Sequence, residues 1–252
     1  MKGLNTYWKE KISGKRVLIT GGTTGIGREI VLLLISFGAR CIICGRHQAQ
    51  IDETIAEANS ISPGAYCLGV VADLSKNEDI ENIFHTVDNI FGGIDILINN
   101  AALGYGSIME GDYEKWSYTV QTNLLSYMAC THHAATRMKA AGSGHILNIG
   151  SMSADVREEG SSVYVATKSG IQGFSEALRK ELNPDGIKVT LIEPGATDTD
   201  MQEASNDEKL LQVAQGEMLK AEDIAMAVAF CLVQPDRCDI VGMQIRPHLQ
   251  LI

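Results

Sequence analysis

Short apolar runs recur along the whole chain, separated by longer stretches with the residue spacing of helices. Two of these runs, Val17-Leu18-Ile19 and Ile96-Leu97-Ile98, are apolar at every position, so both faces of each strand need cover. Helices on both sides of a parallel sheet supply that cover, whereas a half-exposed strand would alternate apolar and polar residues. The pattern therefore predicts an α/β fold with a doubly wound parallel sheet of about seven strands.

No repeat, low-complexity stretch or linker interrupts the alternation, so a single domain over residues 1–252 is expected. The one long irregular segment, Gly195 to Lys220, holds a short amphipathic piece, Glu208–Val213. Because it follows the carboxyl end of a strand, residues 196–220 are expected to form a lid over a site. The predicted strands are Arg16–Thr20, Arg40–Cys44, Tyr66–Val71, Asp95–Ile98, His145–Ile149, Lys188–Ile192 and Val241–Ile245.

The charge balance excludes two classes of partner. The chain has 31 acidic against 21 basic residues, a formal net charge of −10 at pH 7, whereas nucleic acids and anionic membranes attract a surplus of Lys and Arg. The first fifteen residues lack the apolar core of a signal peptide, and no apolar run is long enough to span a bilayer. A cytoplasmic protein acting on a small molecule is expected.

The cysteines predict neither disulfides nor a metal site. Six cysteines in 252 residues are too few for a disulfide scaffold. Cys41 and Cys44 form a C-x-x-C, but they lie in a predicted strand, where an offset of three points the two side chains to opposite faces. Cys130, His132 and His133 lack a second ligand pair at zinc spacing.

A glycine-rich turn follows the first predicted strand and leads into the helical run Arg28–Phe37. Glycine permits a tight turn and lets backbone amides approach a pyrophosphate at a helix N-terminus, where the helix dipole favours anions. A simple turn is the alternative, and the strand before and helix after favour nucleotide binding. The residues of the turn are Thr20, Gly21, Gly22, Thr23, Thr24, Gly25, Ile26 and Gly27.

Two further polar sites follow predicted strands. Asp73, which precedes Leu74, is a candidate for a hydrogen bond to an adenine, with a helix N-cap as the alternative. Asn99-Asn100-Ala101 ends the fourth strand at the carboxyl edge of the sheet, where ligands bind in open α/β folds. An Asx turn is the alternative there.

The segment Tyr164-Val165-Ala166-Thr167-Lys168 places a tyrosine and a lysine one helical turn apart, with Ser151 thirteen residues earlier. An ammonium beside a phenol stabilises the phenolate, so we expect Lys168 to lower the pKa of Tyr164 from its ordinary value of about 10. Such a phenol can act as a general acid or base near neutral pH. The alternative is a solvated pair on a helix surface.

Along nearly its whole length the sequence resembles the short-chain dehydrogenase/reductase superfamily, and it is similar to the bacterial 3-oxoacyl reductases of that group. The resemblance implies a single Rossmann domain and hydride transfer between a nicotinamide cofactor and a carbonyl or secondary alcohol. The motifs that carry it are the glycine turn, Asn99-Asn100-Ala101, Asn123, Ser151, Tyr164-x-x-x-Lys168, and Pro194-Gly195 followed by Thr199.

The resemblance also implies roles for individual residues. Tyr164 would exchange a proton with the substrate oxygen, Ser151 would bond the same oxygen, and Lys168 would hold the nicotinamide ribose. Asn123 would support a water that relays protons to Lys168, completing the catalytic set. The implied cofactor-binding residues are Gly21, Thr23, Thr24, Gly25, Ile26, Gly27, Arg46, Asp73, Leu74, Asn100, Ala101, Tyr164, Lys168, Pro194, Gly195, Thr197 and Thr199.

The cofactor prediction depends on the end of the second strand, Cys44-Gly45-Arg46-His47. An enzyme preferring NAD places a carboxylate here to bond the ribose 2′-hydroxyl, whereas Arg46 offers a cation for a 2′-phosphate. NADP(H) is therefore expected. The alternatives are an NAD-linked alcohol dehydrogenase and a dinucleotide sensor that kept the fold without turnover.

Two expectations concern the surface. Helices around Tyr113–Lys139 and Val163–Leu182 carry more apolar residues than solvated helices need, and the resemblance implies that they pair in a dimer. A tetramer is less expected, because the glycine-rich ending common in tetrameric relatives is absent. Arg157, between Ser151 and Tyr164, is a candidate for binding an acidic substrate, with a surface ion pair as the alternative.

Overall fold

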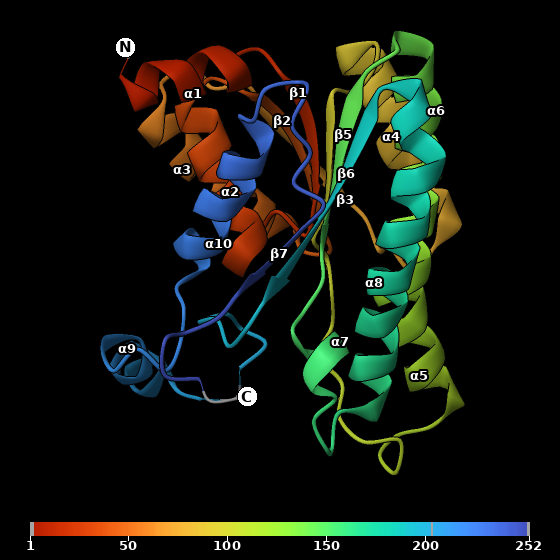
Figure 1. Ribbon diagram of the computed structural model, residues 1–252, viewed down its shortest axis with the longest axis vertical. Coiled ribbons are helices and arrows are strands. Elements are labelled where there is room, and N and C mark those ends of the chain that lie inside the picture. Colours follow the sequence, from red (N-terminus) through yellow and green to blue (C-terminus); the bar gives the residue numbers. More distant parts are fainter. Residues whose placement is uncertain (1–2, 203, 251–252) are drawn as a thin grey trace.

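The computed structural model describes residues 3–202 and 204–250, and it contains a seven-stranded parallel sheet in the order β3-β2-β1-β4-β5-β6-β7 (Figure 1). Every strand predicted from the sequence is confirmed, with ends that differ by no more than two residues. The strands are β1 (Arg16–Thr20), β2 (Arg40–Gly45), β3 (Cys67–Val71), β4 (Ile96–Asn99), β5 (Gly144–Ile149), β6 (Ile187–Pro194) and β7 (Gly242–Ile245).

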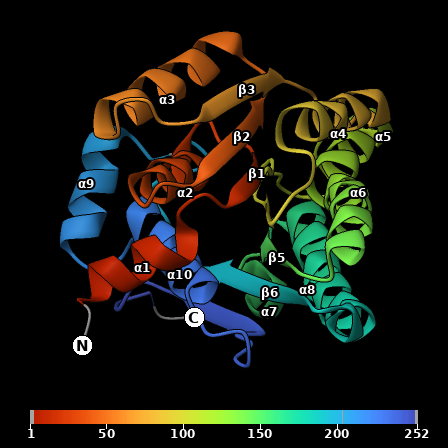
Figure 2. The same ribbon diagram turned by 90° about the horizontal axis from the view of Figure 1, so that it is seen from above.

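Helices cover both faces of the sheet, as the views in Figures 1 and 2 show. One face is covered by α1 (Leu4–Ile12), α2 (Gly25–Ser36), α3 (Gln48–Ile61) and α10 (Ala221–Leu232). The other is covered by α4 (Asn77–Phe91), α5 (Tyr113–Val120), α6 (Ser126–Ala141) and α8 (Ser162–Leu182). The remaining helical segments are the π-helix η1 (Gln121–Leu125), α7 (Ser153–Val156), the 3₁₀ turn η2 (Asn183–Asp185) and α9 (Asn206–Ala214). No helix among the described residues is long and apolar enough to cross a membrane.

Alternate strand residues enter two separate cores. In β1, Val17 and Ile19 join the core beneath α2 and α10, whereas Leu18 joins the core beneath α4 and α6. Cys41 and Cys44 of β2 also lie in opposite cores, as their spacing predicts. Burial of all five side chains on a two-sided sheet explains why these strands are apolar at every position.

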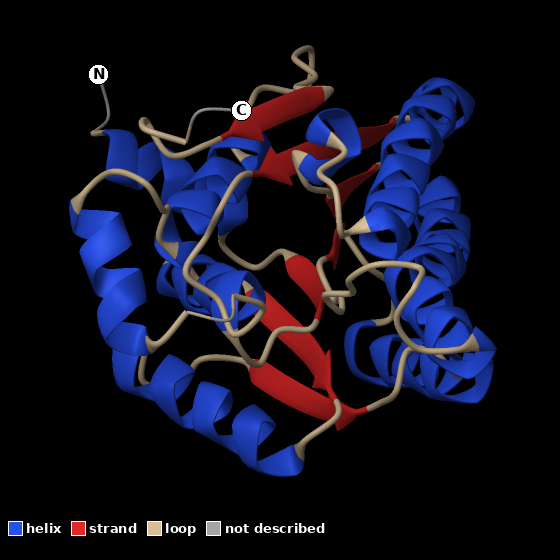
Figure 3. Cartoon of the chain, turned by 90° about the horizontal axis from the view of Figure 1, so that it is seen from below, coloured by secondary structure: helices blue, strands red, loops and turns tan. Residues whose placement is uncertain are grey.

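The strand order reverses at the centre of the sheet, where β1 pairs with both β2 and β4. From β1 the chain winds outward through β2 to β3, and it then returns to β4 and winds the other way. This is the order of a Rossmann fold, in which ligands bind at the carboxyl ends of the strands beside the reversal. Figure 3 views the molecule from below, where loops join the strands to the helices on both sides of the sheet.

The segment that follows β6 is closed at its base by a bridge between Thr197 and Leu219. It contains α9, which begins with a capping box between Ser205 and Glu208 and includes the amphipathic piece Glu208–Val213. The segment also crosses the pocket described below, because an added Cβ on Gly104 would lie 3.2 Å from the Cγ of Met201.

Candidate active site

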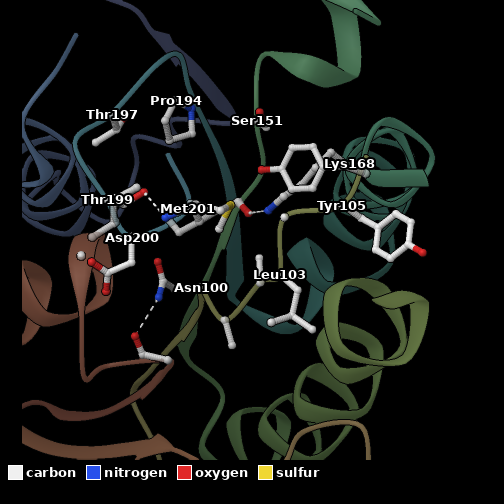
Figure 4. A pocket seen from close by; sticks show the side chains of 18 of the residues that line it. Asn100, Leu103, Tyr105, Ser151, Lys168, Pro194, Thr197, Thr199, Asp200 and Met201 are labelled. Carbon is white, nitrogen blue, oxygen red and sulfur yellow. Dashed lines mark hydrogen bonds between the residues drawn. The ribbon is translucent and has the colours of Figure 1, made fainter. Parts of the chain in front are cut away.

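A pocket of about 1190 Å³ lies along the carboxyl ends of β1 to β6. Residues from six loops line it, although they are far apart in the sequence. Figure 4 shows Pro194, Thr197 and Thr199 on one side of the pocket and Ser151 and Lys168 on the other. The sequence-predicted residues in its lining are Gly21, Thr23, Thr24, Gly25, Ile26, Arg46, Asp73, Leu74, Asn100, Ala101, Ser151, Tyr164, Lys168, Pro194, Gly195, Thr197 and Thr199.

The glycine turn folds tightly against the end of β4. Asn100 donates from Nδ2 to the carbonyl oxygens of Thr20 and Gly21, at 3.0 and 3.1 Å. An added Cβ on Gly27 would overlap the Gly21 carbonyl and lie 2.5 Å from Asn100 Nδ2. Gly27 is therefore a packing residue beneath the pocket rather than part of its lining, and it lets α2 begin directly behind the turn.

The start of α2 is suited to an anion. Thr24 precedes the helix without a side-chain cap, and the first turn of α2 contains no acidic residue. The backbone N–H groups of that turn therefore have no side-chain acceptor, and the helix dipole adds positive potential. Gly25, with φ of 50°, holds the turn in the left-handed region beside Thr199. A dinucleotide pyrophosphate fits this cradle.

The far end of the pocket contains a cation and a carboxylate joined through a tyrosine. Arg46 Nη1 lies 3.2 Å from the hydroxyl of Tyr118, which lies 3.3 Å from both carboxylate oxygens of Asp73. Asp73 also accepts hydrogen bonds from the backbone N–H and the hydroxyl of Ser75. Its carboxylate therefore stabilises the turn before Ser75 and does not cap α4, which begins at Asn77. Burial acts to raise the pKa of Asp73, and the bonds from Ser75 and Tyr118 outweigh it and lower that pKa.

Sequence reasoning missed Tyr118. It lies on α5, more than seventy residues from Arg46 in the chain, and no motif near it signals a contact with the pocket. Only the folded chain brings its hydroxyl between Arg46, which follows β2, and Asp73, which follows β3.

Tyr164 and Ser151 meet at the other end of the pocket. The Ser151 hydroxyl acts to lower the pKa of Tyr164. Burial is the larger effect, and with repulsion from Glu158 it raises that pKa to about 12. The predicted lowering of this pKa is therefore wrong for the structure, in which the phenol keeps its proton at neutral pH.

The burial of Lys168 explains why the pKa of Tyr164 is not lowered as predicted. Its side chain is 2% exposed, and burial lowers the pKa of its amine to about 7, so at neutral pH it is only partly charged. Its Nζ donates to the carbonyl oxygen of Ile149 at 2.9 Å and lies 5.6 Å from the ring centre of Tyr164. A partly neutral amine at that distance stabilises a phenolate too weakly to offset burial.

Asn123 lies outside the pocket lining, within the π-helix η1. Its side chain bonds both backbone groups of Leu103, at 2.7 and 2.8 Å, and also Thr167, at 3.3 Å. It thus joins the loop after β4 to α8, the helix that carries Tyr164 and Lys168. π-Helical turns inside longer helices are often found at functional sites.

Arg157 does not enter the pocket. It has a φ of 55°, and its Nε donates to the carbonyl oxygen of Ala154 within the same turn. Among the described residues it forms no ion pair with Glu158 or Glu159, so neither of the two interpretations of its sequence position describes it. Its neighbours Val156 and Glu158 line the pocket instead.

A Rossmann sheet with an anion cradle at α2 and a Ser–Tyr–Lys group at its carboxyl edge defines a dinucleotide-dependent oxidoreductase. The sequence profile of the family described as short chain dehydrogenase matches residues 15–210. The chain belongs to this family, and it is an oxidoreductase of the alcohol and carbonyl class that acts on small molecules with a nicotinamide dinucleotide.

Individual relatives agree with this assignment. The chain is 38% identical to the 3-oxoacyl-[acyl-carrier-protein] reductase FabG of Haemophilus influenzae, over 92% of this chain and 95% of that protein. It resembles the crystal structure of actinorhodin polyketide ketoreductase with NADPH, with a TM-score of 0.83, 28% identity and coverage of 94% and 97%. It also resembles L-sorbose reductase from Gluconobacter frateurii complexed with NADPH and L-sorbose, with a TM-score of 0.85, 25% identity and the same coverages.

Proposed function

We propose that this protein is an NADP(H)-dependent carbonyl reductase in which Tyr164 supplies the proton. The observation that carries the proposal is the placement of Ser151, Tyr164 and Lys168 together in the pocket lining, with the pKa of the Tyr164 phenol raised to about 12. A phenol that is protonated at neutral pH is a proton donor, which favours the reductive direction. Reductases among the relatives support the same direction.

In this mechanism the protein aligns the carbonyl and delivers a proton. Ser151 donates a hydrogen bond to the carbonyl oxygen, and Tyr164 transfers its proton to that oxygen. Lys168, with its pKa near 7, exchanges protons at neutral pH and can return a proton to the Tyr164 phenol through a bridging hydroxyl. A bound reduced nicotinamide supplies the hydride.

The remaining parts of the pocket bind and cover the cofactor. We assign the pyrophosphate to the start of α2, with Thr199 beside it, and the nicotinamide end to Pro194, Gly195 and Lys168. Residues 196–220 act as a lid, because the Met201 side chain reaches Gly104 on the opposite rim, and Lys209 of α9 donates to the carbonyl oxygen of Thr199 at 2.8 Å.

Cofactor choice is assigned to Arg46. Its guanidinium lies on the pocket lining after β2, where Gly45 supplies no carboxylate to repel a 2′-phosphate. Asp73 shares this end of the pocket, but bonds from Ser75 and Tyr118 hold its carboxylate. A charge-assisted hydrogen bond contributes about 1.5–3 kcal/mol, which corresponds to about one to two decades in preference for NADPH.

Replacing Tyr164 tests the catalytic assignment. Tyr164→Phe should lower turnover of a neutral ketone by roughly 10²–10⁴ while leaving cofactor affinity and the melting temperature nearly unchanged. Tyr105→Phe is the matched control, because Tyr105 also lines the pocket but donates its hydroxyl proton to the Glu110 carbonyl. Near-wild-type turnover by a folded Tyr164→Phe variant would exclude the assignment.

Replacing Arg46 tests the cofactor. The ratio of kcat/KM with NADPH to that with NADH should fall about ten- to a hundredfold in Arg46→Ala. The neighbouring variant His47→Ala removes a ring from the same part of the pocket lining and should leave the ratio within a few-fold. A wild type that prefers NADH, or a ratio that Arg46→Ala does not move, would contradict the proposal.

A further inference from the structure

The pocket wall between Ser151 and Tyr164 carries a negative charge. This wall consists of α7 and the loop that follows it, and Glu158 is its ionisable side chain among the pocket-lining residues. Arg157, the cation next to it in sequence, is bonded back onto Ala154 instead. The local sequence therefore offers either charge to the substrate, and the backbone of this turn presents the carboxylate.

Two hydrogen bonds connect the Glu158 carboxylate to the reacting end of the pocket. The Ser153 hydroxyl donates to Glu158 Oε1 at 2.5 Å, and the Ser153 backbone N–H donates to Ser151 Oγ at 3.1 Å. Repulsion between this carboxylate and the phenolate form of Tyr164 also contributes to the raised pKa of Tyr164. The charge of Glu158 thus acts where the carbonyl is expected to bind, and its Oε2 takes part in neither bond.

Within residues 3–202 and 204–250, Glu158 takes part in no ion pair. Lys168 is buried, bonds Ile149 and is only partly charged near pH 7. Glu110 adds a second carboxylate to the same lining, with its Oε2 beside Gly106. At this end of the pocket the lining thus presents two carboxylates, Glu158 and Glu110.

We propose that Glu158 determines substrate charge, so that the site selects carbonyl compounds carrying a cationic group and disfavours those carrying a carboxylate or phosphate. This inference rests on the proposed function. Glu158 attracts a cation and repels an anion. The substrate cation takes no part in the reaction, in which hydride reaches the carbonyl carbon and the Tyr164 proton reaches its oxygen.

The test compares three methyl ketones of equal length. One ends in a trimethylammonium group, one in the isosteric tert-butyl group and one in a carboxylate, and kcat/KM is measured for each at low ionic strength. For the wild type we expect the order cation, neutral, anion, with about a tenfold ratio between the first and the last. Added salt should reduce the ratio, because it screens exposed charges.

Variants separate Glu158 from the general charge of the protein. Glu158→Gln should bring the cation-to-anion ratio close to one, and because the ratio is taken within one variant, a change in its overall turnover cancels. Glu159→Gln removes the same charge from the adjacent residue, which is outside the pocket lining, and should leave the ratio unchanged.

The experiment distinguishes failure of the role of Glu158 from failure of the reductase assignment. Turnover of the neutral ketone with a wild-type ratio near one, or a ratio equally large in Glu158→Gln, would overturn the role of Glu158 and leave the reductase assignment standing. Absence of turnover of all three ketones with either nucleotide would overturn the reductase assignment and this inference with it.

Discussion

Glu193 is a buried carboxylate that the proposed chemistry does not use. It is 5% exposed at the end of β6, and the Cγ of its side chain would lie 3.1 Å from a Cβ added to Gly150, the residue before Ser151. It accepts from the amides of Gln172 and Gln244, at 3.3 and 3.4 Å. Burial is the main effect on its pKa, and with repulsion from Asp155 it raises that pKa despite both amides.

The raised pKa of Glu193 predicts how the stability of the protein changes with pH. A folded-state pKa above the unfolded value means that the folded protein binds the proton more tightly, so stability falls as pH rises through the folded pKa. At pH 7 the neutral variant Glu193→Gln should therefore melt about 2–4 °C higher than the wild type, the shift expected for ~1 kcal/mol. The gain should vanish as pH falls toward about 4, near the unfolded pKa of a glutamate.

Glu176→Gln is the control for this prediction. Glu176 lies on the surface of α8, and hydrogen bonds from Lys180 and Arg179 lower its pKa, so removing its charge should give no gain in melting temperature at pH 7. A Glu193→Gln variant that melts below the wild type at pH 7 would mean that the two amide bonds outweigh the cost of burying the charge.

At the residue scale, the sequence predicted which residues line the pocket more accurately than it predicted their burial and pKa values. Motif spacing predicted that Ser151, Tyr164 and Lys168 meet, because each follows or lies on an element whose ends converge at one sheet edge. It could not predict that Lys168 would be 2% exposed, and burial reverses the expected effect on the phenol pKa. The inward placement of Glu158 and the outward placement of Arg157 were likewise hidden, because they depend on one left-handed residue.

At the scale of elements, the contact between the glycine turn and α2 leaves no room for a side chain. A Cβ added to Gly27 would overlap the Gly21 carbonyl and the Asn100 side chain. The Asn100 side chain is itself hydrogen-bonded to the Thr20 carbonyl. A methyl group here must displace backbone rather than a flexible side chain. The turn, the end of β4 and the first turn of α2 therefore form one rigid unit.

Gly27→Ala should disturb this unit. We expect a loss of about 1–3 kcal/mol in the free energy of unfolding from overpacking, and at least about a tenfold weaker Kd for NADPH, since the amides that face the pyrophosphate move. Chemical denaturation and fluorescence titration measure the two effects. Gly242→Ala, at a glycine with open space around its Cβ position, should change neither, and unaltered NADPH affinity in Gly27→Ala would contradict the rigid unit.

The sequence predicted the strands more accurately than the helical stretch over 113–139. The strands were visible because a two-sided sheet demands apolar residues at every position, as in Val17–Ile19. The predicted continuous helix over 113–139 is instead divided into α5, η1 and α6. The π-helical turn escaped prediction because the residue types of Gln121–Leu125 do not distinguish i→i+5 from i→i+4 hydrogen bonds.

At the scale of the whole molecule, the elements α5, η1 and α6 carry exposed apolar side chains. Val120, Leu125 and Met128 are 41%, 54% and 37% exposed along these consecutive elements, on the side of the molecule opposite α10 in Figure 1. Ile171, in the second helix that was expected at a dimer interface, is fully buried in its own core beside Tyr127. The surface therefore depends on fewer apolar side chains than the sequence indicated.

We expect this surface to pair with its copy in a two-fold dimer, since burying exposed apolar side chains stabilises association. The double variant Leu125→Glu, Met128→Glu places carboxylates at the interface and should weaken the dimer at least about tenfold. Light scattering at micromolar concentration should give a dimer for the wild type and a monomer for this variant. Circular dichroism checks that both are folded.

Met226→Glu is the matched control, because Met226 is 48% exposed on α10, on the other side of the sheet. It adds a carboxylate in place of an equally accessible methionine and should leave the dimer intact. If Met226→Glu dissociates the protein while the double variant does not, the subunits meet through α10 instead. A wild type that is monomeric at micromolar concentration would refute pairing through either surface, because the exposed side chains of α5, η1 and α6 would then face solvent in the working enzyme.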